Sequence, residues 1–126
     1  MAEQNQTDRK AIFALTMLHF TGDFYIAFIN PLLPVFVEKL SLSLAQVGII
    51  AGTMRILGFI VQPGVGYFAD RYHSKVLIIG GPVLTIIFIS LSGLAGGFYY
   101  LLFFVVIGSI GSSLFHPSTA GIHPGI

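Results

Sequence analysis

The strongest constraint in this sequence is the spacing of its charged residues. Between Val76 and Ile126 there is no Asp, Glu, Lys or Arg, and from Leu40 to Ala69 the only such residue is Arg55. From Ala11 to Val37 the only one is Asp23. A bilayer core about 30 Å thick is crossed by a helix of about 20 apolar residues. The stretches from Ala11 to Val37 and from Leu40 to Ala69 therefore each predict one spanning helix, and the longer stretch from Val76 to Ile126 predicts two.

The composition supports a membrane protein. Only 9% of the residues are charged and 55% are hydrophobic, whereas soluble domains carry about 25% charged residues. A disordered chain is excluded because the sequence is too apolar, and a disulfide scaffold is excluded because it has no cysteine. A net charge of +1 without a basic run predicts no nucleic-acid partner. We expect an all-α protein integral to the lipid bilayer, because the apolar runs are continuous rather than alternating as in barrel strands.

The predicted helices and their orientation follow from the same pattern. We expect an N-terminal tail at 1–10 and spanning helices near 11–37, 44–68, 76–95 and 98–119. Short cytoplasmic loops are enriched in Lys and Arg. The tail carries Arg9 and Lys10 and the second loop carries Arg71 and Lys75, whereas the first loop has only Lys39. This asymmetry predicts a cytoplasmic N-terminus.

Polar residues of the first two predicted helices share one face in each helix. At 100° per residue, one stripe holds Thr16, His19, Asp23, Asn30 and Pro34, and another holds Gly48, Gly52, Arg55, Phe59, Gln62 and Gly66. The helical rise places Asp23 and Arg55 at similar depths. A charge at the bilayer centre costs about 2.5–3.5 kcal/mol on insertion scales. We predict that Asp23 and Arg55 face one polar cavity and that Asp23 carries protons; the alternative is a static pair that fixes helix packing.

Other intramembrane residues leave two interpretations open. His19 relays protons to Asp23 or only hydrogen-bonds to a neighbour. Pro31 and Pro34 either kink the first helix or mark its loose end. In the fourth helix, small residues on one face favour close packing: Gly108, Gly111, Ser112, Phe115 and Thr119 form that face. His116 at its edge either lines the cavity or is a helix-end histidine.

The loop between the second and third predicted helices carries the most specific motif. It reads G-Y-F-A-D-R-Y-H-S-K from Gly66 to Lys75. Its glycine, Asp70, Arg71 and Lys75 resemble the signature loop of the major facilitator superfamily, with His73 in place of the usual glycine. The resemblance implies that this loop braces neighbouring helices and helps to gate the transport cycle, as it does in that family.

Three further segments resemble parts of that superfamily: the first resembles a motif of many drug–proton antiporters, and the other two resemble the fosmidomycin-resistance-type exporters. They are N-P-L-L-P-V-F at 30–36, V-Q-P-G-V-G-Y-F-A-D at 61–70 and G-S-S-L-F-H-P-S at 111–118. The resemblance implies a twelve-helix fold of two six-helix bundles, of which this chain would supply the N-terminal part of the first. It also implies proton-driven efflux of a small antimicrobial or polar solute across the bacterial inner membrane. Such a transporter would need the missing C-terminal helices, so we expect the chain to be a fragment or truncated product.

Other function classes receive less support. No nucleophile motif, metal-ligand spacing or phosphate-binding loop occurs, so we expect neither an enzyme nor a cofactor or metal. A small four-helix multidrug exporter acting as a dimer fits the length but leaves the loop motif and Arg55 unexplained. A non-transporting membrane subunit is the remaining alternative. The pathway residues predicted for a transporter are His19, Asp23, Asn30, Arg55, Gln62 and His116.

Overall fold

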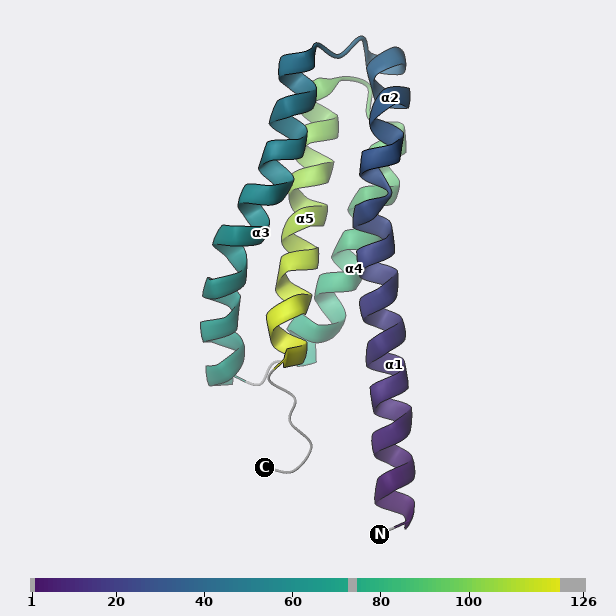
Figure 1. The fold of residues 1–126 in the computed structure, drawn as a ribbon, viewed down its shortest axis with the longest axis vertical. Coiled ribbons are helices and arrows are strands. Elements are labelled where there is room, and N and C mark those ends of the chain that lie inside the picture. Colours follow the sequence, from purple (N-terminus) through teal and green to yellow (C-terminus); the bar gives the residue numbers. More distant parts are fainter. Residues whose placement is uncertain (1, 73–74, 121–126) are drawn as a thin grey trace.

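The computed structural model describes residues 2–72 and 75–120, without the side chains of residues 2–5, 7, 69, 70, 72 and 116–120. Every regular element in these residues is a helix (Figure 1). Their order is α1 (Ala2–Ala27), α2 (Ile29–Leu40), α3 (Leu44–Tyr72), α4 (Lys75–Leu91), the short 3-10 helix η1 (Ser92–Leu94) and α5 (Phe98–Ala120).

Four segments of the described chain are long and apolar enough to cross a membrane. They are Asp8–Leu40, Leu44–Phe68, Lys75–Leu94 and Phe98–Phe115. The prediction of four spanning helices is thereby confirmed. The first helix begins at Ala2 rather than near residue 11, because nothing in the polar tail stops a helix that the following apolar residues extend. In Figure 1 this end of α1 projects past the ends of the other helices.

A break divides the first spanning segment at Phe28, between α1 and α2. The cause is local: Pro31 has no amide hydrogen, and its ring crowds the carbonyl four residues earlier, that of Ala27. The amide of Phe28 is shared between the carbonyls of Phe24 and Tyr25, at 3.1 and 3.2 Å. Helix α2 then continues through Pro34 to Leu40. Phe28 itself keeps helical backbone angles (φ −66°, ψ −22°), so the interruption is confined to one residue before Pro31 and Asp8–Leu40 remains one span.

The turn from α2 to α3 is capped at both ends. Ser41 adopts the left-handed conformation (φ 53°), and the following amide of Leu42 reaches back to the carbonyl of Val37 at 3.2 Å. Ser43 Oγ accepts from the amide of Gln46 at 3.2 Å, and Gln46 Oε1 accepts from the amide of Ser43 at 2.9 Å. This reciprocal capping box fixes the start of α3.

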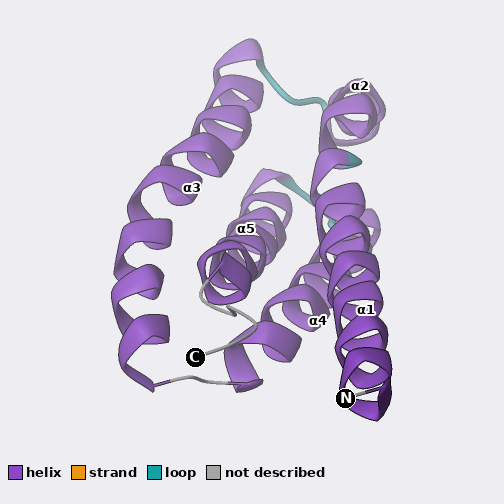
Figure 2. Ribbon diagram, turned by 60° about the horizontal axis from the view of Figure 1, so that its bottom comes forward, coloured by secondary structure: helices purple, strands orange, loops and turns teal. Residues whose placement is uncertain are grey.

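Helix α5 lies between α3 and α4, and α1 runs beside α4 (Figure 2). Glycines allow α4 and α5 to touch backbone to backbone: a Cβ at Gly81 would lie 2.7 Å from the carbonyl oxygen of Gly111. Buried Thr85 donates to the carbonyl of Gly108 across this interface at 2.9 Å. The close packing predicted for Gly108 and Gly111 is confirmed. By contrast, nothing lies within 4 Å of a Cβ built at Gly48 or Gly52.

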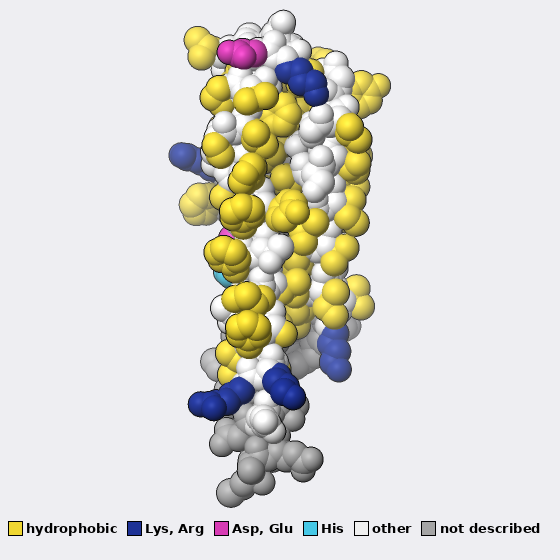
Figure 3. All heavy atoms as spheres, turned by 90° about the vertical axis from the view of Figure 1, so that its right-hand side faces the viewer, with side chains coloured by type: hydrophobic (Ala, Val, Ile, Leu, Met, Phe, Trp, Pro, Cys, Tyr) yellow, Lys and Arg dark blue, Asp and Glu magenta, His cyan; other side chains and the backbone are white. Residues whose placement is uncertain are grey.

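The outer surface suits a lipid environment. In Figure 3, hydrophobic side chains run along the face formed by α1, while Lys and Arg lie mainly toward the two ends of the molecule. Phe13, Phe20 and Phe59 are 66%, 63% and 83% exposed. Such aromatic exposure is unfavourable in water but is expected of helices that face lipid.

Candidate functional site

A polar cavity of about 270 Å³ lies where three spanning segments meet. The first segment contributes a residue from each side of its break, Ile26 from α1 and Asn30 from α2. The remaining lining comes from α3 and α5: Ala51, Met54, Arg55, Gly58, Gln62, Ser109, Ser112 and Ser113. Three of the predicted pathway residues, Asn30, Arg55 and Gln62, are therefore brought to one cavity.

Helical periodicity explains how α3 presents its polar residues to this cavity. Arg55 and Gln62 are seven residues apart, which is close to two full turns, so they share a face. Arg55 stands eleven residues after Leu44 and thirteen before Phe68, near the middle of its span. A guanidinium at this depth is costly unless it faces protein or water, and the cavity supplies that setting.

The serines of α5 form the opposite wall. Ser109 is only 4% exposed, and its Oγ has no hydrogen-bond partner within the described structure. Ser113 Oγ donates to the carbonyl of Ser109 at 2.9 Å. Helical periodicity places Ser112 on a packing face but does not distinguish Ser109 or Ser113. Serine is common in membrane helices, so only the placement of α5 against α3 distinguishes these two.

Asp23 does not pair with Arg55. Its Oδ2 lies 3.0 Å from Nε2 of His19, one turn earlier on α1. Arg55 has no ion-pair partner among the described residues, and Asp23 is not among the residues that line the Arg55 cavity. The prediction of one shared cavity for Asp23 and Arg55 is therefore corrected: their depths are similar, but the two side chains serve different sites.

The histidine–aspartate pair connects α1 to α5. The His19 ring lies against the ring of Phe115, with centroids 5.1 Å apart. The side chains of His19 and Asp23 are 41% and 44% exposed. Asp23 stands fifteen residues after Asp8 and seventeen before Leu40, again near mid-span. At this depth the half-exposed carboxylate has a basic side chain within reach.

The predicted gating loop is described in part. Arg71, in the last turn of α3, donates from Nη1 to the hydroxyl of Tyr67 at 3.2 Å. Lys75 is exposed at the first residue of α4, and Gly66 is half-buried in α3. The side chain of Asp70 lies outside the described residues, as does that of His116, so their predicted roles gain nothing from the structure.

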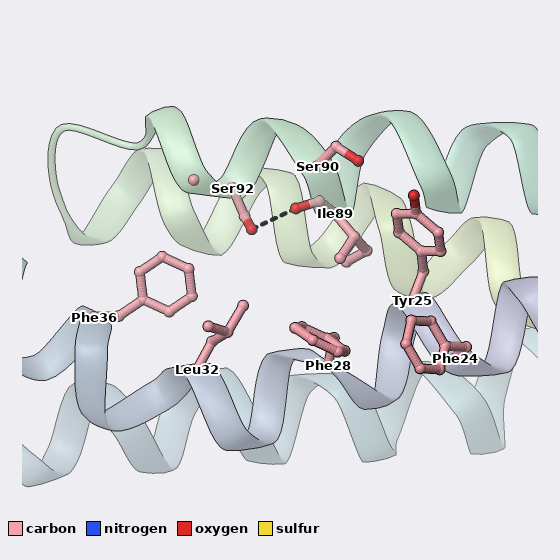
Figure 4. A pocket seen from close by; sticks show the side chains of 9 residues that line it. Phe24, Tyr25, Phe28, Leu32, Phe36, Ile89, Ser90 and Ser92 are labelled. Atoms are coloured by element: carbon pink, nitrogen blue, oxygen red, sulfur yellow. Dashed lines mark hydrogen bonds between the residues drawn. The ribbon is translucent and has the colours of Figure 1, made fainter.

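A second, largely apolar cavity lies between the first segment and α4 (Figure 4). Its volume is about 340 Å³, and Phe28, Leu32 and Phe36 line it opposite Ile89 and Ser92. The Ser92 hydroxyl donates to the carbonyl of Ile89, so this polar group is already satisfied. The cavity offers shape and aromatic surface but no charge.

Among the side chains that the structure describes, no three or more His, Cys, Asp or Glu residues form a group that could hold a metal ion. The described site residues offer one cation with hydroxyl and amide groups in the polar cavity and, separately, one histidine–carboxylate pair.

Comparison with known proteins gives a consistent family assignment. The model of the Major Facilitator Superfamily matches residues 12–123. The fosmidomycin resistance protein of Escherichia coli is 29% identical over 109 residues, covering 86% of this chain and 27% of that protein. The quinolone resistance protein NorA of Staphylococcus aureus is 26% identical over 113 residues, covering 90% of this chain and 29% of that protein. No solved structure matches.

A third relative is an uncharacterised MFS-type transporter, YfnC, of Bacillus subtilis. It is 29% identical over 99 residues, covering 79% of this chain and 24% of that protein. The chain thus spans about a quarter of the length of the curated relatives it matches.

Proposed function

This chain belongs to the major facilitator superfamily, and on that premise we propose that it works as part of a proton-coupled exporter of small antimicrobials or polar solutes. The family consists of multi-pass membrane transporters rather than enzymes. Two of the relatives carry names of drug resistance, to fosmidomycin and to quinolones. Because the chain spans about a quarter of their length, we propose that it acts together with further helices.

We further propose that the protein lies in the bacterial plasma membrane with a cytoplasmic N-terminus. The named relatives are bacterial. The excess of Lys and Arg in the N-terminal segment and around Arg71 supports this orientation. In this orientation the α2–α3 turn faces outward and the loop between α3 and α4 faces the cytoplasm.

The observation that carries the proton coupling is the mid-span pair of Asp23 and His19, 3.0 Å apart. An ionised Asp23 holds His19 through a charge-assisted hydrogen bond. A proton arriving from outside neutralises the carboxylate and weakens that bond. His19 also contacts Phe115, so the change reaches the packing of α1 on α5.

The transport step then follows the general physics of alternating access. Two bundles rock around a site near the midplane. A ligand shifts such an equilibrium only by its different affinities for the two states. Protonation of Asp23 favours one orientation of the bundles, and substrate bound in the Arg55 cavity favours the other. Entry of the proton therefore drives export of the substrate, and binding of the substrate drives release of the proton.

The test is Asp23→Asn in the full transporter that contains this chain, with Asp8→Asn as the matched control. The Asp8→Asn substitution removes the same charge at an exposed position near the start of α1. In everted vesicles, we expect Asp23→Asn to abolish substrate-driven proton movement, while Asp8→Asn keeps it. Unchanged proton coupling in Asp23→Asn would overturn the proposed carrier. Export by the 126-residue chain alone would instead favour a small exporter acting as a dimer.

A further inference from the structure

We propose that the cavity around Arg55 binds a small oxyanion, the phosphate-like or carboxylate group of the exported substrate. This inference rests on the proposed transport function and names the class of substrate for it. Arg55 is the only charged residue that lines the cavity. It has no ion-pair partner in the described part of the chain. An uncompensated guanidinium near the middle of a span selects an anion and repels a cation.

The buried hydroxyl of Ser109 is the second observation, and it is independent of the charge. Ser109 is one of the residues that line the cavity, and its Oγ is buried without a hydrogen-bond partner within the described structure. Buried polar atoms are nearly always satisfied, because desolvation without a partner is costly. A bound oxygen atom would supply the missing acceptor.

The rest of the lining agrees with an oxygen-rich anion. Asn30 and Gln62 add amide groups that can donate, and Ser112 adds a hydroxyl. The proton of Ser113 is already committed to the carbonyl of Ser109. A planar guanidinium matches two oxygens of a carboxylate or phosphate at once. At about 270 Å³, the cavity accepts a small headgroup and not the whole of a large drug.

Protection from phenylglyoxal tests this site directly. The chain contains three arginines: Arg55 lines the cavity near mid-span, whereas Arg9 and Arg71 lie near the ends of spanning segments and outside the cavity. The 126-residue chain is reconstituted in phosphatidylcholine nanodiscs, and each arginine is followed by peptide mass spectrometry. We expect inorganic phosphate or acetate to slow modification of Arg55 alone, and choline at equal ionic strength to slow none.

Two results would overturn the proposal. One is equal protection of the three arginines, which reports ionic strength only. The other is no protection of Arg55 in a chain whose circular dichroism shows full helix content. A further arm uses nanodiscs that contain phosphatidylglycerol: protection there, but not by soluble phosphate or acetate, would assign the site to a lipid headgroup and contradict the substrate assignment.

Ser109→Ala supplies the structural half of the test, with Ser90→Ala as control because Ser90 lines the apolar cavity instead. A hydrogen bond to a charged group contributes enough that its loss weakens binding by about tenfold or more. We expect the phosphate concentration for half-protection of Arg55 to rise by that factor in Ser109→Ala only. Since the wild-type hydroxyl has no partner, thermal stability should not fall. Unchanged protection in Ser109→Ala would remove Ser109 from the site.

The failure of this proposal is distinguishable from a failure of proton coupling. The protection assay measures equilibrium binding and needs no transport. If Asp23→Asn abolishes coupling while Arg55 is never protected, the protein is a proton-coupled transporter of some other substrate class. If Arg55 is protected while Asp23→Asn transports normally, the anion site stands and the proton carrier lies elsewhere.

Discussion

His19 and Asp23 contact each other within one helix: Nε2 of the histidine lies 3.0 Å from Oδ2 of the aspartate. Residues four apart on a helix stand one above the other, so the bond forms without strain. The same histidine contacts Phe115 of α5. The pair therefore joins the carboxylate of α1, through the histidine ring, to a neighbouring helix, and its removal has consequences that can be measured.

Replacing His19 should impair transport most when the new side chain cannot donate a hydrogen bond to Asp23. A charge-assisted hydrogen bond contributes about 1.5–3 kcal/mol, and half exposure reduces this to about 1 kcal/mol. We expect His19→Leu to lower proton-driven export about fivefold and His19→Gln, which keeps a donor, to recover most of it. Equal export by the two variants would show that the hydrogen bond has no part in the cycle.

The α4–α5 interface should tolerate no methyl group at Gly81. A Cβ there would lie 2.7 Å from the carbonyl oxygen of Gly111 and 3.1 Å from the amide of Phe115, both backbone atoms. Overpacking of this kind costs about 1–3 kcal/mol. We expect Gly81→Ala to lower the thermal midpoint in detergent, and Gly80→Ala, where nothing lies within 4 Å, to leave it unchanged or raise it. Equal thermal midpoints for Gly81→Ala and Gly80→Ala would show that the interface accommodates a methyl group at Gly81 and would contradict this prediction.

The hydroxyl of Thr85 should stabilise the same interface. It is fully buried and donates to carbonyls of Gly108 and Gly81, at 2.9 and 3.2 Å. Interhelical hydrogen bonds in membranes average about 0.6 kcal/mol and reach about 1.7 kcal/mol. We expect Thr85→Val to destabilise the chain within that range in reversible unfolding from bilayers. Thr21→Val is the control, because the Thr21 hydroxyl donates to the carbonyl of Met17 within its own helix. If Thr21→Val lowers the free energy of unfolding as much as Thr85→Val does, the interhelical bond makes no contribution of its own.

The orientation can be read by cysteine labelling, because the chain contains no cysteine and gives no background. Ser43 is exposed in the α2–α3 turn, and Gln6 is exposed near the start of α1. With the N-terminus in the cytoplasm, a membrane-impermeant maleimide added to intact cells should label Ser43→Cys and spare Gln6→Cys. Permeabilisation should then expose both. The reverse pattern would invert the topology.

Much of the candidate site was predictable because it depends on local geometry. Asn30, Arg55 and Gln62 were selected from helical periodicity and depth, and the structure places all three around one cavity. The pair of His19 and Asp23 could also be anticipated from their spacing of four residues. Periodicity could not show whether Asp23 and Arg55 share a cavity, because depth along a helix says nothing about the direction in which a neighbouring helix faces.

The serines show the same limit from the other side. Ser109 and Ser113 have no pattern that distinguishes them from packing residues, and Ser109 gains its importance from an Oγ left without a partner beside the Arg55 cavity. That position follows from where α5 lies against α3. Only the assembled helices decide which of many small polar side chains meets a charge.

The sequence by itself determined that this chain crosses a membrane four times and that its few intramembrane charges lie near mid-span. Both follow from the cost of placing charges in hydrocarbon and from a fixed rise per residue, which act on each helix separately. The tertiary structure alone decided that Arg55 faces serines instead of Asp23. The reason is packing: the close approach at Gly81 and Gly111 sets α5 against α4, and the arrangement of the helices around α5 sets which side chains share a cavity.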